Sequence, residues 1–201
     1  MFLAFDGSSI DGSAYTDVVG LAQRSPAWLD DVISAWSTYG LAVFVVLIVA
    51  AWWRARRQST SVAVRALAVP AIVLVAYGAD YVIKLIVRED RPCQSLRVST
   101  LEACPAQGDW SFPSNHAALA AATAVALYFV SRRLGAVALV AAAAMAASRV
   151  WVGVHYPHDV VAGVAVGALV ALALVILLRR MPETMAVRLT ATRLRPLLVA
   201  S

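Results

Sequence analysis

The stretch SRVWVGVHYPHD, residues 148–159, interrupts a hydrophobic part of the chain with charged side chains. Arg149, His155 and Asp159 stand here between two apolar runs, each long enough to span a membrane. A charged side chain inside a bilayer costs at least ~2.5–3.5 kcal/mol, so it persists mainly where it pairs, lines a wet cavity or reacts. The position of these residues marks a candidate site before any motif is considered.

The composition is that of an integral membrane protein. The 201 residues are 61% hydrophobic and 14% charged, which is too apolar for a soluble domain of this size. The net charge of +5 does not indicate a nucleic-acid-binding protein, because the arginines form short clusters between apolar runs. Anionic lipid headgroups explain these clusters better, so we expect membrane lipids and no nucleic acid as partners.

The hydropathy pattern predicts an all-α, polytopic membrane helical bundle, folded as one domain over residues 1–201. Residues 1–31 are acidic and fit either a short interfacial helix or a partly ordered tail, while residues 181–201 are expected as a cytoplasmic tail. About five transmembrane helices are expected, near residues 32–53, 66–87, 115–130, 134–152 and 160–178.

Basic residues concentrate on one side of these spans, where Glu183 is the only acidic residue. The positive-inside rule makes that side cytoplasmic and places the N-terminus, the connection 88–111 and the turn at His155 outside. The basic residues on that side, 11 of the 17, are Arg54, Arg56, Arg57, Arg65, Arg132, Arg133, Arg179, Arg180, Arg188, Arg193 and Arg195.

Two pairs of residues leave alternatives open. Cys93 and Cys104 lie in the same outward connection and fit either a disulfide or two free thiols. Gly163 and Gly167 form a pair of small residues that fits close packing within the chain or the contact of a homodimer.

Three basic residues near the end of the second span form the first part of the candidate site. Spacings of four and seven put Lys84, Arg88 and Arg91 on one face of a helix that Pro92 ends, and such a face favours an anion. For Lys84 alone, an alternative is snorkelling to the interface, with Asp80 as its partner one turn earlier.

The second and third parts each open an apolar helix. In FPSNH, residues 112–116, Ser114 suits a helix N-cap, while the free N–H groups and the positive end of the helix also suit a phosphate; His116 beside them could supply a proton. Pro157 suits the first turn of the last span, which lets the carboxylate of Asp159 hold His155 in the tautomer that a nucleophile needs.

In order and spacing, these three parts resemble the signature of the type 2 phosphatidic acid phosphatase (PAP2) superfamily. The matching residues are Lys84 with Arg91 and Pro92, then Pro113 to His116, then Ser148 with Arg149, His155 and Asp159. At Asn115 the commonest family pattern has glycine. Asparagine tolerates a left-handed backbone, and its presence resembles the bacterial undecaprenyl-pyrophosphate phosphatase branch.

The resemblance implies a role for each matching residue. His155 would attack phosphorus and carry a phosphohistidine, Asp159 would orient it, and His116 would protonate the leaving oxygen. Because cations neutralise the phosphoryl charge, neither a metal nor another cofactor is expected. The phosphoryl oxygens would be bound by Lys84, Arg91, Ser114, Asn115 and Arg149.

The expected function is hydrolysis of a polyprenyl (undecaprenyl or decaprenyl) diphosphate at the outer face of the membrane. Phosphatidylglycerophosphate, phosphatidate or a decaprenyl-phosphoryl sugar are alternative substrates, and a non-catalytic lipid-binding or transport protein is the alternative from another class. Arg88 would touch a second phosphate or pair with Glu89 or Asp90, and His158 is expected at headgroup level.

Overall fold

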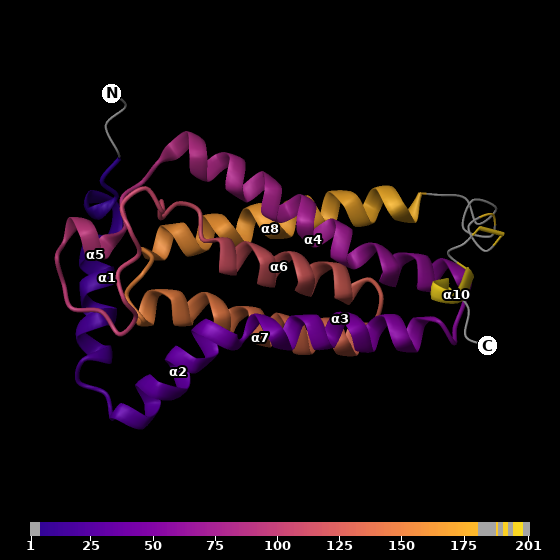
Figure 1. Cartoon of the computed structure of the whole chain (residues 1–201), viewed down its shortest axis with the longest axis horizontal. Helices are drawn as coiled ribbons and strands as arrows, with labels where there is room; N and C mark the ends of the chain where they lie inside the picture. Colours follow the sequence, from indigo (N-terminus) through magenta and orange to yellow (C-terminus); the bar gives the residue numbers. More distant parts are fainter. Residues whose placement is uncertain (1–4, 181–187, 189–190, 193–194, 199–201) are drawn as a thin grey trace.

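The computed structural model describes residues 5–180, 188, 191–192 and 195–198. These residues form helices and no strand, as expected for an all-α fold. Figure 1 shows α3, α4, α6, α7 and α8 running along the long axis, with α1 and α5 across one end. The helices are α1 Ser8–Ala22, α2 Ala27–Tyr39, α3 Leu41–Ala55, α4 Thr60–Val87, α5 Pro92–Ser95, α6 Asn115–Tyr128, α7 Arg132–Trp151, α8 Pro157–Arg179 and α10 Arg195–Leu198.

Three or four of the five expected membrane spans have the length and composition of a membrane-crossing helix. By length and composition, α4, α7 and α8 can each cross a membrane, and α2 with α3 makes a fourth span if this pair, bent by 53° at Gly40, counts as one. The third expected span is the 14-residue α6. At 1.5 Å per residue it is ~21 Å long, shorter than the ~30 Å of a bilayer core.

The short helix α6 lies in the middle of the bundle, in contact with α3, α4, α7 and α8. Most of its buried side chains are alanines, so neighbouring backbones approach closely. A Cβ on Gly163 would come within 2.4 Å of the Ser114 carbonyl oxygen, and one on Gly167 within 2.2 Å of that of Ala118. The glycine pair therefore packs α8 against α6 within the chain, and a homodimer stays a prediction that needs another surface.

The N-terminal segment forms the helix α1 rather than a partly ordered tail. Tyr15 is fully buried, and its hydroxyl donates a hydrogen bond to the carbonyl oxygen of Gly153, 2.8 Å away. Cys93 and Cys104 form a disulfide within the connection that follows α4. The expected C-terminal tail lies largely outside the described residues.

Candidate active site

Six of the predicted site residues line one cavity of about 320 Å³. They are Lys84, Arg91, Asn115, His116, Arg149 and His155, and the cavity is completed by Tyr77, Pro105, Asp109 and Leu119. The cavity lies where α6 begins, at the end of the bundle that α1 crosses (Figure 1). Both histidines therefore face the same space, one from α6 and the other from the turn before α8.

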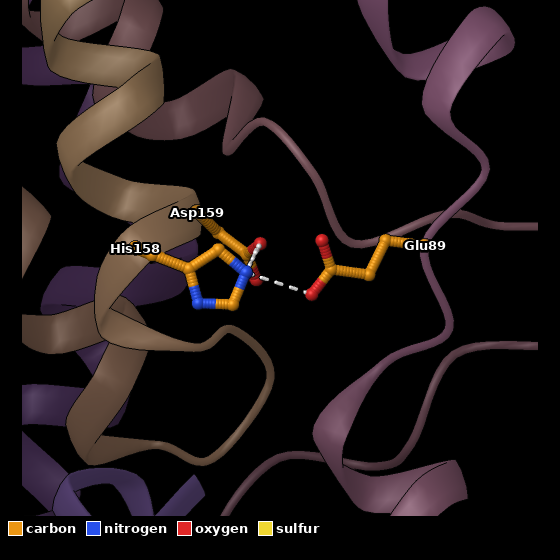
Figure 2. Close-up of side chains that lie close together, drawn as sticks. All are labelled: Glu89, His158 and Asp159. Atoms are coloured by element: carbon orange, nitrogen blue, oxygen red, sulfur yellow. Dashed lines mark hydrogen bonds and ion pairs between the residues drawn. The ribbon is translucent and has the colours of Figure 1, made fainter. Parts of the chain in front are cut away.

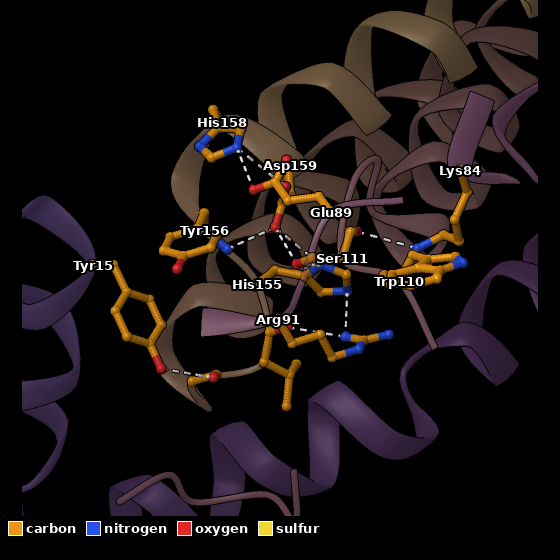
Figure 3. A network of polar contacts seen from close by, with 12 residues as sticks. Tyr15, Lys84, Glu89, Arg91, Trp110, Ser111, His155, Tyr156, His158 and Asp159 are labelled. Atoms are coloured by element: carbon orange, nitrogen blue, oxygen red, sulfur yellow. Dashed lines mark hydrogen bonds and ion pairs between the residues drawn. The ribbon is translucent and has the colours of Figure 1, made fainter. Parts of the chain in front are cut away.

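His155 is held with one ring nitrogen toward a guanidinium group. It precedes Pro157, which opens α8 as expected, and its side chain is almost fully buried. Nη1 of Arg91 lies 3.3 Å from His155 Nε2 and donates to the Val154 carbonyl oxygen at 2.9 Å (Figure 3). Because a guanidinium can only donate, Nε2 is the acceptor and the ring proton sits on Nδ1. The lone pair of a nucleophile is thus on the nitrogen facing Arg91.

The other ring nitrogen faces Asp159 and a serine. His155 Nδ1 lies 3.4 Å from Asp159 Oδ2, and that oxygen accepts closer hydrogen bonds from the Ser111 hydroxyl at 2.5 Å and the Tyr156 N–H at 2.8 Å. Ser111 Oγ is also 3.4 Å from His155 Nδ1, so the hydroxyl lies beside the carboxylate oxygen and both face the ring nitrogen (Figure 3). Sequence reasoning missed Ser111, whose only signal was its place directly before residues 112–116.

The surroundings of His155 favour the neutral ring. Burial lowers the pKa of His155 well below its usual value, and the positive charges of Arg91 and Arg149 lower it further. At pH 7 the imidazole is therefore unprotonated, which is the form that can attack an electrophile.

Lys84 is held in the site by backbone carbonyl groups. Its Nζ donates to the carbonyl oxygens of Trp110, at 2.7 Å, and Ser111, at 3.1 Å. Neither carboxylate oxygen of Asp80 has a hydrogen-bond partner among the described residues. Lys84 therefore does not snorkel to the interface, because its ammonium group is buried and faces the cavity. Asp80, one turn earlier, acts on it through charge and not through a hydrogen bond.

Arg91 reaches the cavity by a different route from the one predicted. Arg88 has a left-handed backbone (φ 53°) that ends α4 at Val87, so the expected helical face of Lys84, Arg88 and Arg91 does not form. Arg91 instead precedes α5 and binds Asp109 through a 3.0 Å ion pair. Arg88 is exposed and is not among the described residues that line the cavity.

The third cation, Arg149, comes from the last turn of α7 and also has an acidic partner. Its Nη1 lies 3.4 Å from Glu102 Oε2 and donates to the Ser37 hydroxyl. Glu102 and Asp109 both belong to the connection 88–111, and sequence reasoning assigned neither of them. They offset part of the positive charge of the cavity.

The start of α6 carries two polar groups without partners. Ser114 is the N-cap residue, as expected, but its hydroxyl makes no capping hydrogen bond. This hydroxyl and the Asn115 side-chain oxygen are buried and find no hydrogen-bond partner among the described residues. An unsatisfied buried polar group costs ~1–3 kcal/mol, so these atoms suit a ligand that would satisfy them.

His158 bridges carboxylates beside the cavity, and its expected place at headgroup level stays a prediction. Its Nδ1 is 2.7 Å from Asp11 Oδ1. Its Nε2 is 2.8 Å from Glu89 Oε1 and 3.4 Å from Asp159 Oδ1 (Figure 2). Glu89, His158 and Asp159 offer donor atoms within 4.8 Å of one another, a mixed nitrogen and oxygen set of the kind zinc accepts. This group was not foreseen, because its members come from separate segments.

Taken together, the cavity offers an unprotonated imidazole, a second imidazole and three cations in a confined space. Phosphoryl transfer needs mainly positioning and neutralisation of charge on the phosphoryl oxygens. The arrangement can therefore accommodate a phosphoryl group with both imidazoles facing it.

Comparisons with known proteins agree with this chemistry. The family model described as PAP2 superfamily matches residues 65–182. The chain is 30% identical over 142 residues to undecaprenyl-diphosphatase BcrC of Bacillus subtilis (strain 168), covering 71% of each protein. It is 39% identical over 97 residues to decaprenylphosphoryl-5-phosphoribose phosphatase of Mycobacterium tuberculosis, covering 48% of this chain and 51% of that protein.

Two crystal structures share the fold. One is a transmembrane PAP2 type phosphatidylglycerolphosphate phosphatase from Bacillus subtilis, with a TM-score of 0.57, 20% identity and coverage of 85% of this chain and 87% of that one. The other is LpxE of Aquifex aeolicus, with a TM-score of 0.60, 16% identity and coverage of 85% and 98%.

Proposed function

The chain belongs to the PAP2 superfamily and is a multi-pass membrane lipid phosphatase, and we propose that it cleaves a polyprenyl diphosphate through a phosphohistidine. The observation that carries this proposal is that His116, His155 and three cations line one cavity. The diphosphate substrate is favoured by the relative named undecaprenyl-diphosphatase, which matches 71% of the chain.

In the first step, His155 Nε2 attacks the terminal phosphorus, so that an N–P bond forms and the bond to the leaving oxygen breaks. His116 gives a proton to that oxygen, which leaves as the lipid monophosphate. Ser111 and Asp159 hold the attacking ring, because the hydroxyl and the carboxylate both face Nδ1. Lys84, Arg91 and Arg149, with Ser114 and Asn115, bind the phosphoryl oxygens.

In the second step, His116 accepts a proton from a water molecule that attacks the phosphohistidine. The N–P bond breaks, inorganic phosphate is released, and His155 regains its lone pair. Because the cations of the cavity already neutralise the phosphoryl oxygens, neither step calls for a metal.

The test is release of inorganic phosphate from a polyprenyl diphosphate by the purified chain in EDTA. We expect the intact chain to release phosphate and His155→Ala to release none above background. Equal release by both chains would refute hydrolysis through His155. Loss of release in EDTA that is restored by added metal would refute the metal-free mechanism.

A second candidate substrate is a decaprenyl-phosphoryl sugar whose sugar carries its own phosphate, which is favoured by the relative from Mycobacterium tuberculosis named decaprenylphosphoryl-5-phosphoribose phosphatase. Its terminal phosphate monoester has the same phosphoryl chemistry and would enter the same cavity. Comparison of kcat/KM for this lipid, a polyprenyl diphosphate, phosphatidate and phosphatidylglycerophosphate separates the candidates.

The catalytic end faces the outside of the cell in this proposal, since the arginine clusters stand at the end of α3, the start of α7 and the end of α8. Figure 1 shows these helix ends opposite the end that α1 crosses. Single cysteines at two exposed positions test the orientation, because Cys93 and Cys104 are already paired. A membrane-impermeant maleimide applied to intact cells should label Ser99→Cys and leave Gln58→Cys unlabelled. The reverse labelling pattern would show that the catalytic end faces the cytoplasm and would refute the proposed orientation.

A further inference from the structure

Two adjoining cavities lie at the end of the bundle opposite the catalytic cavity. The first, of about 310 Å³, is lined by Arg65, Tyr128, Phe129, Val130, Arg132 and Arg179. The second, of about 270 Å³, has an almost wholly apolar lining that includes Leu139, Ala168 and Leu172. Tyr128 and Phe129 line both, so a cationic cavity continues into an apolar groove.

The cationic cavity draws one arginine from each of three helices. Arg65 is on α4, Arg132 begins α7 and Arg179 ends α8. None of the described lining residues is acidic, in contrast to the catalytic cavity, where Asp109 pairs with a cation. An anion is therefore the complement that this cavity lacks.

The Phe129 ring, which lines both cavities, is held in place. The Arg179 guanidinium lies 5.5 Å from the centroid of the Phe129 ring, so the arginine reaches over the aromatic edge of the cavity. Behind Tyr128, Gly135 approaches so closely that a Cβ there would come within 2.2 Å of the Tyr128 Cα. The wall that both cavities share is thus built on close packing of α6 against α7.

The apolar groove opens toward the lipid-facing side. Leu139, Leu169 and Leu172 are 46%, 65% and 37% exposed, and Tyr128 is 41% exposed. An apolar groove on a membrane helix that runs into a ring of arginines has the polarity profile of a phospholipid, with an acyl chain below an anionic headgroup.

This pair of cavities is separate from the catalytic cavity. His116 and Tyr128 lie near opposite ends of α6, so about 18 Å of helix separates the two sites. None of the described residues lining the arginine cavity is a histidine or a carboxylate, so the paired groups proposed for hydrolysis in the catalytic cavity have no counterpart there. A lipid held here is bound without being hydrolysed.

We propose that this face binds an anionic phospholipid, with its headgroup phosphate among Arg65, Arg132 and Arg179 and one acyl chain in the groove beside Ala168. The bound lipid would belong to the leaflet at the arginine-rich end, and the site is independent of the substrate. It ties α4, α6, α7 and α8 together at the end of the bundle that the disulfide does not reach.

The experiment compares lipids and variants of the full-length chain in detergent by native mass spectrometry. The probes are phosphatidylglycerol, phosphatidylcholine and soluble glycerol phosphate. The test variant is Arg65→Gln with Arg132→Gln and Arg179→Gln. Its matched control is Arg54→Gln with Arg133→Gln and Arg180→Gln, which removes three charges from the same end without touching the described lining of the cavity.

The intact chain should prefer phosphatidylglycerol to phosphatidylcholine and should not retain glycerol phosphate. In the test variant the preference for phosphatidylglycerol over phosphatidylcholine should fall by about tenfold or more, because each arginine near a lipid surface contributes to binding. The control variant should keep the preference. Ala168→Phe, which fills the groove and keeps every charge, should weaken phosphatidylglycerol binding while phosphatase activity confirms that the chain is folded. Equal loss in the control and the test variant, unchanged binding by Ala168→Phe, or binding of glycerol phosphate as tight as that of the lipid would overturn the proposal.

Discussion

Replacing Ser111 with alanine tests how the proposed nucleophile is held. The hydroxyl donates to Asp159 Oδ2 at 2.5 Å and lies 3.4 Å from His155 Nδ1. A hydrogen bond to a charged group contributes ~1.5–3 kcal/mol, which would correspond to a loss of roughly 10- to 150-fold in rate. Because the direct contact between His155 and Asp159 survives, we expect the lower end, a fall in kcat of about tenfold.

The Michaelis constant should change little in this variant. Ser111 Oγ is not among the described groups that line the cavity, and Lys84 binds the backbone carbonyl oxygen of Ser111, which alanine retains. The assay is phosphate release from a polyprenyl diphosphate at several substrate concentrations. Ser99→Ala, at an exposed position in the same connection, is the matched control and should behave like the intact chain.

A double-mutant cycle separates positioning from general damage. If Ser111 acts through Asp159, then Ser111→Ala should cost little more in a chain that already carries Asp159→Asn. Ser111→Thr keeps a hydroxyl and should restore part of kcat. An unchanged kcat in Ser111→Ala, a raised KM with normal kcat, or fully additive losses would refute a positioning role.

Three further predictions concern protonation, the disulfide and helix packing. Burial and nearby arginines lower the pKa of His155, so its ring stays unprotonated as the pH falls through 6.5. When kcat/KM is measured between about pH 4.5 and 8, its acid limb should therefore lie below pH 6.5. An acid limb at or above pH 6.5 would contradict this assignment. The Cys93–Cys104 disulfide closes a short loop and should stabilise the folded chain by ~3 kcal/mol, because it lowers the entropy of the unfolded chain. Reductant should therefore lower the thermal midpoint of the intact chain and leave that of a variant with Cys93→Ser and Cys104→Ser unchanged. Gly167→Val should destabilise the chain by ~1–3 kcal/mol or more by forcing α8 from α6, whereas Gly78→Ala, with no atom within 4 Å of the new Cβ, should leave the thermal midpoint the same or higher.

Several features were predictable from the sequence because they depend on local composition. Apolar runs of bilayer length predicted α4, α7 and α8, and Pro157 predicted where α8 begins. The three motifs that resemble the PAP2 signature contain six of the side chains that line the cavity. In each case the information lies within one helix or one turn, where hydropathy and helix-capping preferences act.

Other features depended on how the helices pack. The bend at Gly40 and the short length of α6 reflect packing inside the bundle, which hydropathy does not report. Ser111 and Asp159 are 48 residues apart, and Asp11 and His158 are 147 apart, yet each pair forms a hydrogen bond.

What the sequence by itself determined was therefore the membrane class, most of the helices and most of the residues that line the candidate site. Tertiary structure alone decided which carbonyls hold Lys84, which carboxylates pair with Arg91 and Arg149, and that the Ser111 hydroxyl joins Asp159 in facing His155. The physical reason is that hydrophobic burial and helix formation act over a few turns of one chain segment, whereas hydrogen bonds between distant segments exist only once the packed helices have brought their donors and acceptors within about 3 Å.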